Sequence, residues 1–329
     1  MSRSAVEAGP LAQVVTRHLG AAHTIDGLWR LSGGASRETW SFDAVADGGV
    51  RLPLVLRRDP PGSAVLGTPV DEYALIGAAA RSGVPVAPLR FRLEPADQLG
   101  TGFVTDFVAG ETLGRRIVHD DPYGPARAVF AGECGRILAG LHRVPVEDTP
   151  LEPPSATRSS AAAQLDLFER LLDGYDVARP VLELALRWLR THATNGGRRV
   201  VVHGDFRVGN LIVGPEGIRA VLDWELAHIG EPAEDIGWLC TRSWRFGGPG
   251  RVGGVGDLDG LLAAYGQAGG DPIDPEQVRY WEVLGNLRWA VIAVAQAFSH
   301  LHGVRRSVEL AAIGRRVAEV EHDLMELLA

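Results

Sequence analysis

Three polar residues stand at fixed distances in the second half of the chain, each where a predicted strand ends. Asp205 and Asn210 lie in the loop between two apolar runs, and Asp223 follows a third run, residues 218–222. Phosphoryl-transfer sites pair an Asp, which accepts the proton of the attacking hydroxyl, with an Asn and a second Asp that hold Mg²⁺ on nucleotide phosphates. Turn chemistry explains any one of these residues. It does not explain all three at this spacing.

The composition excludes other ways of binding phosphate. The chain has 329 residues and is 46% hydrophobic, which is enough for two lobes around a cleft. It contains no lysine, so all 33 basic residues are arginine. A phosphate-binding loop of the GxxxxGK type and a Schiff-base lysine are therefore both excluded. Any side chain that clamps phosphates through a positive charge must be an arginine.

Net charge and apolar runs narrow the range of partners. The charge of −8 argues against nucleic acid and is compatible with a cationic small molecule. The longest apolar run, residues 289–298, is too short to cross a membrane. The first ten residues lack the apolar core of a secretion signal, so we expect a cytoplasmic protein without a membrane partner. The two cysteines, Cys134 and Cys240, are expected to be buried apolar residues.

Periodicity predicts an α+β protein in which the strands come first. Alternating and helical patterns in the first hundred residues predict a small antiparallel sheet with strands at 27–31, 38–45, 52–58, 89–93 and 102–108, and helices at 10–19 and 70–82. Beyond Gly110 the pattern is mainly helical, with helices at 125–143, 161–172, 180–192, 233–242, 258–265, 275–302 and 307–328. The glycine-rich segment 247–256 follows a helix, so we interpret it as a mobile loop near the substrate.

The motif His203–Asn210 with the later Leu222–Glu225 resembles the aminoglycoside phosphotransferase and choline kinase family. The chain is most similar to the branch fused to acyl-CoA dehydrogenases, in Val55–Gly62, Leu222–Gly237 and Arg279–Glu282. The resemblance implies a bilobal protein-kinase-like fold with a small antiparallel-sheet N-lobe and a larger, mainly helical C-lobe. The N-lobe would be residues 1–108, the hinge about 104–110 and the C-lobe 109–329. ATP and Mg²⁺ would be the cofactors, and the partner a small-molecule hydroxyl acceptor.

The same resemblance implies residues that bind the nucleotide. Small residues in the first hairpin would let backbone N–H groups approach the phosphates: Gly33, Gly34 and Ser36. Backbone groups of the hinge, around Asp106 and Val108, would bond the adenine.

The third strand carries an arginine where kinases have a lysine. Because side chains alternate along a strand, Val55 would lie on the adenine and Arg57 would point at the phosphates. Arg58 would then be an exposed residue at the strand end. Glu72 would pair with Arg57, although Asp71 is a rival for that role.

Two further residues each have two alternative roles, and the sequence does not decide between them. Arg207 either stabilises the charge on the transferred phosphoryl group or forms a structural salt bridge within the loop. Asp235 either holds the catalytic loop or caps a helix. His203 is expected to brace the loop, because Asp205 is better placed to accept the proton.

These observations favour an ATP-dependent phosphotransferase that modifies a hydroxyl of a small molecule. The acceptor would be a hydroxy acid or its acyl thioester, or else an aminoglycoside or amino alcohol. Five residues are available to line a site for a cationic acceptor: Glu225, Glu231, Glu282, Trp281 and Trp244. The alternative function is a catalytically inactive nucleotide-binding module, which the missing lysine would suggest.

Overall fold

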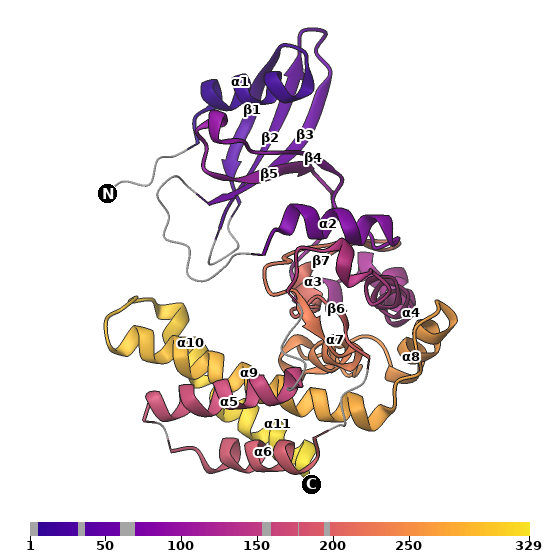
Figure 1. The fold of residues 1–329 in the computed structure, drawn as a ribbon, viewed down its shortest axis with the longest axis vertical. Helices are drawn as coiled ribbons and strands as arrows, with labels where there is room; N and C mark the ends of the chain where they lie inside the picture. Colours follow the sequence, from indigo (N-terminus) through magenta and orange to yellow (C-terminus); the bar gives the residue numbers. More distant parts are fainter. Residues whose placement is uncertain (1–5, 32–36, 60–69, 153–158, 177, 194–197) are drawn as a thin grey trace.

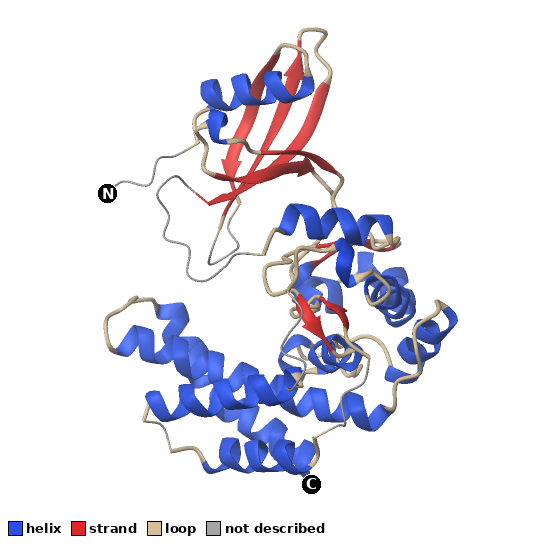
Figure 2. Ribbon diagram, in the orientation of Figure 1, coloured by secondary structure: helices blue, strands red, loops and turns tan. Residues whose placement is uncertain are grey.

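Five antiparallel strands form the sheet that the first hundred residues were predicted to build (Figures 1 and 2). The computed structural model describes residues 6–31, 37–59, 70–152, 159–176, 178–193 and 198–329. Within the sheet the order is β1-β2-β3-β5-β4. The strands are β1 (His23–Arg30), β2 (Glu38–Ala46), β3 (Arg51–Asp59), β4 (Leu89–Arg92) and β5 (Thr101–Asp106).

The two faces of this sheet have different neighbours. Leu54 and Leu56 of β3 are fully buried with apolar residues of α1 (Ala8–Leu19), so α1 covers one face. Phe103 of β5 packs instead with Leu75 of α2 (Glu72–Arg81). Phe103 is also the register partner of Arg57. Because paired residues on adjacent strands share a face, Arg57 points toward α2 and the helical part of the chain.

The remainder of the described chain is mainly helical and lies below the sheet in Figure 1. Its helices are α3 (Gly114–His119), α4 (Gly124–Leu141), α5 (Ser160–Gly174), α6 (Pro180–Thr191), α7 (Pro232–Cys240), α8 (Leu258–Gln267), α9 (Pro275–Leu301), α10 (Val308–Arg315) and α11 (Val317–Leu328). Two short strand pairs are inserted among them. β6 (Val200–Val202) pairs with β9 (His228–Gly230), and β7 (Leu211–Gly214) with β8 (Gly217–Val221). The predicted α+β, protein-kinase-like architecture is confirmed.

Some sequence-based expectations about the elements were wrong. The helix predicted at 307–328 is divided at Arg316 into α10 and α11, and neither α3 nor β9 was foreseen. Gly314 lets α10 approach α9 closely, since a Cβ at that position would lie 2.4 Å from the Cβ of Ala297. The glycine-rich segment 247–256 is packed rather than free. Val252 is fully buried, and a Cβ on Gly254 would lie 2.2 Å from the carbonyl oxygen of Arg245.

The expectation that Arg58 is exposed at the strand end was also wrong, because the side chain is buried. Its guanidinium is 2% exposed and lies 3.0 Å from the carboxylate of Glu38, which is itself buried. The same guanidinium donates a hydrogen bond to the carbonyl oxygen of Leu99. The ion pair joins β2 and β3 on the face opposite Arg57, so Arg58 contributes to the stability of the sheet.

Replacing Arg58 with alanine should therefore destabilise the protein. The change leaves the carboxylate of Glu38 buried without its main partner, which typically costs about 3–5 kcal/mol. Urea unfolding of Arg58→Ala would measure the loss. Arg51→Ala on the same strand is the matched control, because Arg51 pairs with Asp26 and Asp43 in solvent and should change stability little. Equal stability of the two variants would contradict the role of the buried pair.

Candidate active site

The loop that carries Asp205 runs from the end of β6 to the start of β7. Gly204 has a φ of 73°, and a Cβ there would lie 2.4 Å from the carbonyl oxygen of Leu226, so this position requires glycine. A short 3-10 turn, Val208–Asn210, ends the loop. The backbone N–H of Leu222 then donates to the carbonyl oxygen of Asn210, at 2.8 Å. This bond holds the end of the Asp205 loop next to the segment that delivers Asp223.

Asp205 is held by three side-chain donors. Its Oδ1 accepts hydrogen bonds from Trp238 Nε1 at 2.7 Å and Arg207 Nε at 3.1 Å. Its Oδ2 accepts from Asn210 Nδ2 at 2.6 Å. The carboxylate thus has one orientation, and the structure brings three of the predicted residues together around it: Asp205, Arg207 and Asn210.

Asp235 on α7 fixes the backbone of the same loop. Its fully buried carboxylate accepts the N–H of His203 at 2.8 Å and the N–H of Gly204 at 2.9 Å. His142 lies 3.3 Å away. Burial acts to raise the pKa of Asp235, but the hydrogen bond and charge of His142, with the backbone donor, hold that pKa below its usual range. Asp235 is therefore a carboxylate that braces the loop, rather than a cap of α7, whose N-cap is Glu231.

His203 supports the loop from inside. Its Nδ1 accepts the N–H of Asp205 at 3.2 Å, and its Nε2 lies 2.9 Å from the carbonyl oxygen of Leu222. This pattern requires a neutral ring with its proton on Nε2. Complete burial lowers the pKa of His203, in agreement with a neutral ring. His203 is consequently placed to position the loop and has no exposed nitrogen for proton transfer.

Asp223 has a backbone conformation that few residues adopt. Its φ is 63°, in the left-handed region where Asp and Asn are enriched among non-glycine residues. Its Oδ1 lies 2.7 Å from Arg57 Nη2. Glu225 is 3.5 Å from the same nitrogen. The strained turn directs the Asp223 carboxylate toward the sheet, where Arg57 meets it.

Arg57 also forms an ion pair with Glu72, the first residue of α2. Arg57 Nε lies 3.3 Å from the Glu72 carboxylate, which also pairs with Arg37. Burial is the largest cause that raises the pKa of Glu72, and the two arginines oppose it. Burial alone would lower the pKa of Arg57, but the charges of Glu72 and Asp223 raise it. Asp71, the rival for this pairing, caps α2 and pairs with Arg92.

The oxygen atoms near Asp205 suit a magnesium ion. Asn210 uses its Nδ2 to donate to Asp205, which leaves its amide oxygen as a metal ligand. Asp223 offers a partly exposed carboxylate that already holds a cationic group. One amide oxygen and one carboxylate, with phosphate oxygens added, form the hard donor set that Mg²⁺ prefers. The residues present therefore fit the ion.

The structure describes only some of the other residues that were predicted to bind the nucleotide. Gly33, Gly34 and Ser36 lie outside the described residues. Val55 is half-buried, beside Arg57 on β3. Asp106 is the last residue of β5 and its side chain pairs with Arg90 at the surface, whereas Val108 lies two residues beyond the strand. That pairing is compatible with a role for the backbone there.

Sequence reasoning assigned no contact to three residues that lie at the site: Arg37, Trp238 and Arg288. Arg288 of α9 donates to the carbonyl oxygen of Gly204 at 2.7 Å, and its guanidinium lies 4.5 Å from the ring centre of Trp238. The signal available for Trp238 was its position three residues after Asp235, which puts both on one helical face. Arg288 and Arg37 lack a comparable local signal, because their partners are far away in the sequence.

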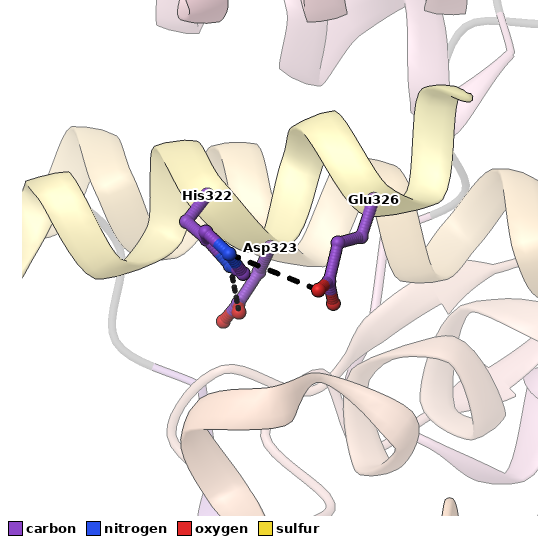
Figure 3. A group of neighbouring side chains, drawn as sticks. All are labelled: His322, Asp323 and Glu326. Atoms are coloured by element: carbon purple, nitrogen blue, oxygen red, sulfur yellow. Dashed lines mark ion pairs between the residues drawn. The ribbon is translucent and has the colours of Figure 1, made fainter.

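A second group of side chains that could ligate a metal lies on α11. Figure 3 shows His322, Asp323 and Glu326 on one side of the helix. Arg242 already pairs with both carboxylates of this group. The group is thus an ion-pair cluster that connects the 3-10 turn Arg242–Trp244 to α11.

The two lobes and this arrangement of Asp, Asn and Asp define a protein-kinase-like phosphotransferase. The profile of the phosphotransferase enzyme family matches residues 28–281. The chain belongs to this family and is a kinase-type enzyme, as the sequence predicted. Among the described residues, no helix is both long and apolar enough to span a membrane.

Solved structures share this fold at low sequence identity. A putative aminoglycoside phosphotransferase from Ralstonia eutropha JMP134 is 23% identical, with a TM-score of 0.76 over 98% of both chains. A spectinomycin phosphotransferase in complex with ADP and spectinomycin is 14% identical, with a TM-score of 0.64 over 98% of this chain and 99% of that one.

Acyl-CoA dehydrogenase family member 10 from Mus musculus is 29% identical over 198 residues, which are 57% of this chain and 18% of that protein. Member 11 from Homo sapiens is 27% identical over 192 residues, 55% of this chain and 24% of that protein. The chain therefore matches about a fifth to a quarter of these relatives' length.

His228 lies against the Asp205 loop, since a Cβ on Gly204 would be 3.2 Å from its Nδ1. His228, at the start of β9, is 3.2 Å from the Glu234 carboxylate through Nε2 and 2.9 Å from the carbonyl oxygen of Leu226 through Nδ1. Both neighbours are acceptors, which favours a ring protonated on both nitrogens. Burial would lower the pKa of His228, but the charge and hydrogen bond of Glu234 raise it to about 9. Glu234 also binds Ser160 and Gln164, so the pair connects β9 to α5.

Stability should depend on pH through His228. Because the folded-state pKa of about 9 exceeds the unfolded value, the contribution is complete below about pH 6.5 and is lost as the pH rises through 9. Urea unfolding at about pH 6 and about pH 9.5 should show that His228→Gln is less stable than the parent mainly at the lower pH. A stability difference that is the same at both values would contradict the charged pair.

Proposed function

We propose that the protein transfers the γ-phosphate of ATP to a hydroxyl of a small molecule. The observation that carries the proposal is the 2.7 Å ion pair of Arg57 and Asp223. This pair joins Arg57 of the sheet to Asp223, a candidate metal ligand. The residue before Asp223 is hydrogen-bonded to Asn210, which in turn binds Asp205. In phosphoryl transfer most of the catalysis comes from positioning and charge neutralisation, and this arrangement supplies both.

The nucleotide would bind between an N-lobe of residues 1–108 and a C-lobe of residues 109–329. Backbone groups at Asp106 and Val108 would bond the adenine, with Val55 against its face. Arg57, oriented by Glu72, would bind the phosphates, and the hairpin residues Gly33, Gly34 and Ser36 would cover them. Mg²⁺, held by Asn210 and Asp223, would neutralise phosphate charge.

Asp205 would accept the proton as the acceptor oxygen bonds to the γ-phosphorus. The bond to the β-phosphate oxygen breaks, and ADP leaves with that oxygen. Arg207 lies beside Asp205 and would stabilise charge on the transferred group. Its ion pair with Asp205 and its stacking on Trp244, at 4.7 Å, hold it in place for that role. The salt-bridge role anticipated for Arg207 is thus compatible with the catalytic one.

The charges near Asp205 favour a hydroxy acid or its acyl thioester over a cationic acceptor. Three cationic side chains border the loop: Arg207, Arg288 and His228. The carboxylate of Glu282, expected to line a site for a cationic acceptor, is bound by Arg245 and Arg251. Trp281 is 1% exposed, so it offers no surface to a ligand. The similarity to acyl-CoA dehydrogenase family members supports the same choice.

Asp205→Asn tests the reaction and separates it from the alternative, a catalytically inactive nucleotide-binding module. The parent should phosphorylate members of a panel of hydroxy acids, hydroxyacyl-CoA thioesters, amino alcohols and aminoglycosides with Mg-ATP. The variant keeps the shape of the side chain without the base, so kcat should fall about 10²- to 10⁴-fold while ATP affinity changes little. Tight binding of ATP by a parent that never turns it over would favour the inactive module.

Asp223→Ala tests the metal ligand. Removing a carboxylate ligand beside several phosphate charges should abolish the stabilisation of the protein by ATP that depends on Mg²⁺. Thermal unfolding with ATP, with and without Mg²⁺, measures this. Asp26→Ala, far along β1, is the control and should retain the full shift of the melting temperature. An Asp223→Ala protein that ATP and Mg²⁺ stabilise as well as the parent would exclude this metal assignment.

A further inference from the structure

One turn of α7 contacts three consecutive residues of the catalytic loop. Asp235 accepts the N–H groups of His203 and Gly204, and Trp238, three residues later on the same helical face, donates its indole N–H to Asp205. Backbone and side chain of the loop are therefore held by the same rigid element.

The donors around Asp205 are distributed unequally between its two oxygens. An ionised carboxylate offers about two lone pairs on each oxygen. Among the described residues, Oδ1 receives two donors, Trp238 Nε1 at 2.7 Å and Arg207 Nε at 3.1 Å. Oδ2 receives one, Asn210 Nδ2 at 2.6 Å. Oδ1 is thus saturated, and Oδ2 keeps a lone pair for one more donor.

From this geometry we infer that Trp238 is a positioning residue that makes Oδ2 of Asp205 the atom that receives the acceptor's proton. The inference rests on the proposed function, since it concerns the base of that reaction. Without the indole N–H, Oδ1 would have a free lone pair, and either oxygen could accept the hydroxyl. The carboxylate could then rotate, and fewer bound acceptors would be aligned with the phosphorus.

The indole itself has little freedom to move. Trp238 is 4% exposed, and the centre of its ring lies 4.5 Å from the guanidinium carbon of Arg288 and 5.1 Å from the ring centre of Trp244. On α9, a Cβ added to Gly285 would lie 3.2 Å from Trp238 Cε3, so the absence of a side chain at Gly285 makes room for the ring. This packing fixes the direction of the N–H. An indole N–H whose direction is fixed can hold a carboxylate in one orientation, because the indole itself does not rotate.

Trp238→Phe removes the N–H and keeps an aromatic ring, and Trp289→Phe is its matched control. Trp289 is also buried, in the same aromatic cluster, but among the described residues its N–H has no hydrogen-bond partner. We expect turnover of Mg-ATP, with water as the acceptor, to fall about tenfold in Trp238→Phe at an almost unchanged KM for ATP. Trp289→Phe should retain the parent rate.

A double variant that carries Trp238→Phe and Asp205→Asn distinguishes loss of the hydrogen bond from loss of packing. Trp238→Phe should slow the parent but have no further effect in the Asp205→Asn background, since both changes act on one carboxylate. Equal rates for Trp238→Phe and Trp289→Phe, or full additivity with Asp205→Asn, would overturn the inference.

An NMR measurement keeps this inference separate from the proposed function. The indole N–H signal of Trp238, identified by its loss in Trp238→Phe, should shift in Asp205→Asn while the signal of Trp289 stays in place. An unshifted Trp238 signal would refute the contact even in an active enzyme. A parent that turns over ATP neither with water nor with any member of the acceptor panel, but shows the shift, would refute the proposed function and, with it, the catalytic role of Oδ2, while leaving the contact intact.

Discussion

The buried carboxylate of Asp235 is the interaction on which the rest of the site depends. It is fully inaccessible, and burying a charge is unfavourable unless donors compensate for it. The donors are the backbone N–H groups of His203 and Gly204, with His142 from α4. The loop conformation and the ionisation of Asp235 therefore support each other. Loss of either leaves unsatisfied polar groups in the core, and Asp205 would lose its fixed direction.

A second constraint connects this loop to the sheet. Arg57 contacts Glu72 through Nε and Asp223 through Nη2, so one planar guanidinium spans a helix and a loop. A lysine offers a single point charge and could not hold two carboxylates in defined directions in the same way. The arginine at this position thus suits a site in which a left-handed Asp223 and the first residue of α2 must be aligned together.

The sequence predicted local interactions better than interactions between residues far apart in the chain. Strand alternation is local, so it correctly placed Arg57 toward α2 and Arg58 on the opposite face. Burial of Arg58 was missed because its partners come from another strand and from the loop at Leu99. The Asp–Asn–Asp spacing found the loop but not Trp238, which reaches Asp205 across 33 positions and could be linked to the loop only through the helical face that it shares with Asp235. The glycine-rich segment was misinterpreted because close packing and flexibility select the same residue type.

The lack of lysine shapes the electrostatics around Asp205. Arginine is less strongly hydrated than an ammonium group and stacks on aromatic rings, whereas lysine is a mobile point charge. Arg207 lies over Trp244 and Arg288 over Trp238, so the two arginines beside the Asp205 loop have fixed orientations. Positive charge that is already oriented needs no reorganisation when negative charge arrives. Trp238, which orders Arg288, also donates to Asp205 and packs on Trp244, so the aromatic pair couples the position of the Asp205 carboxylate to the position of the two guanidinium groups.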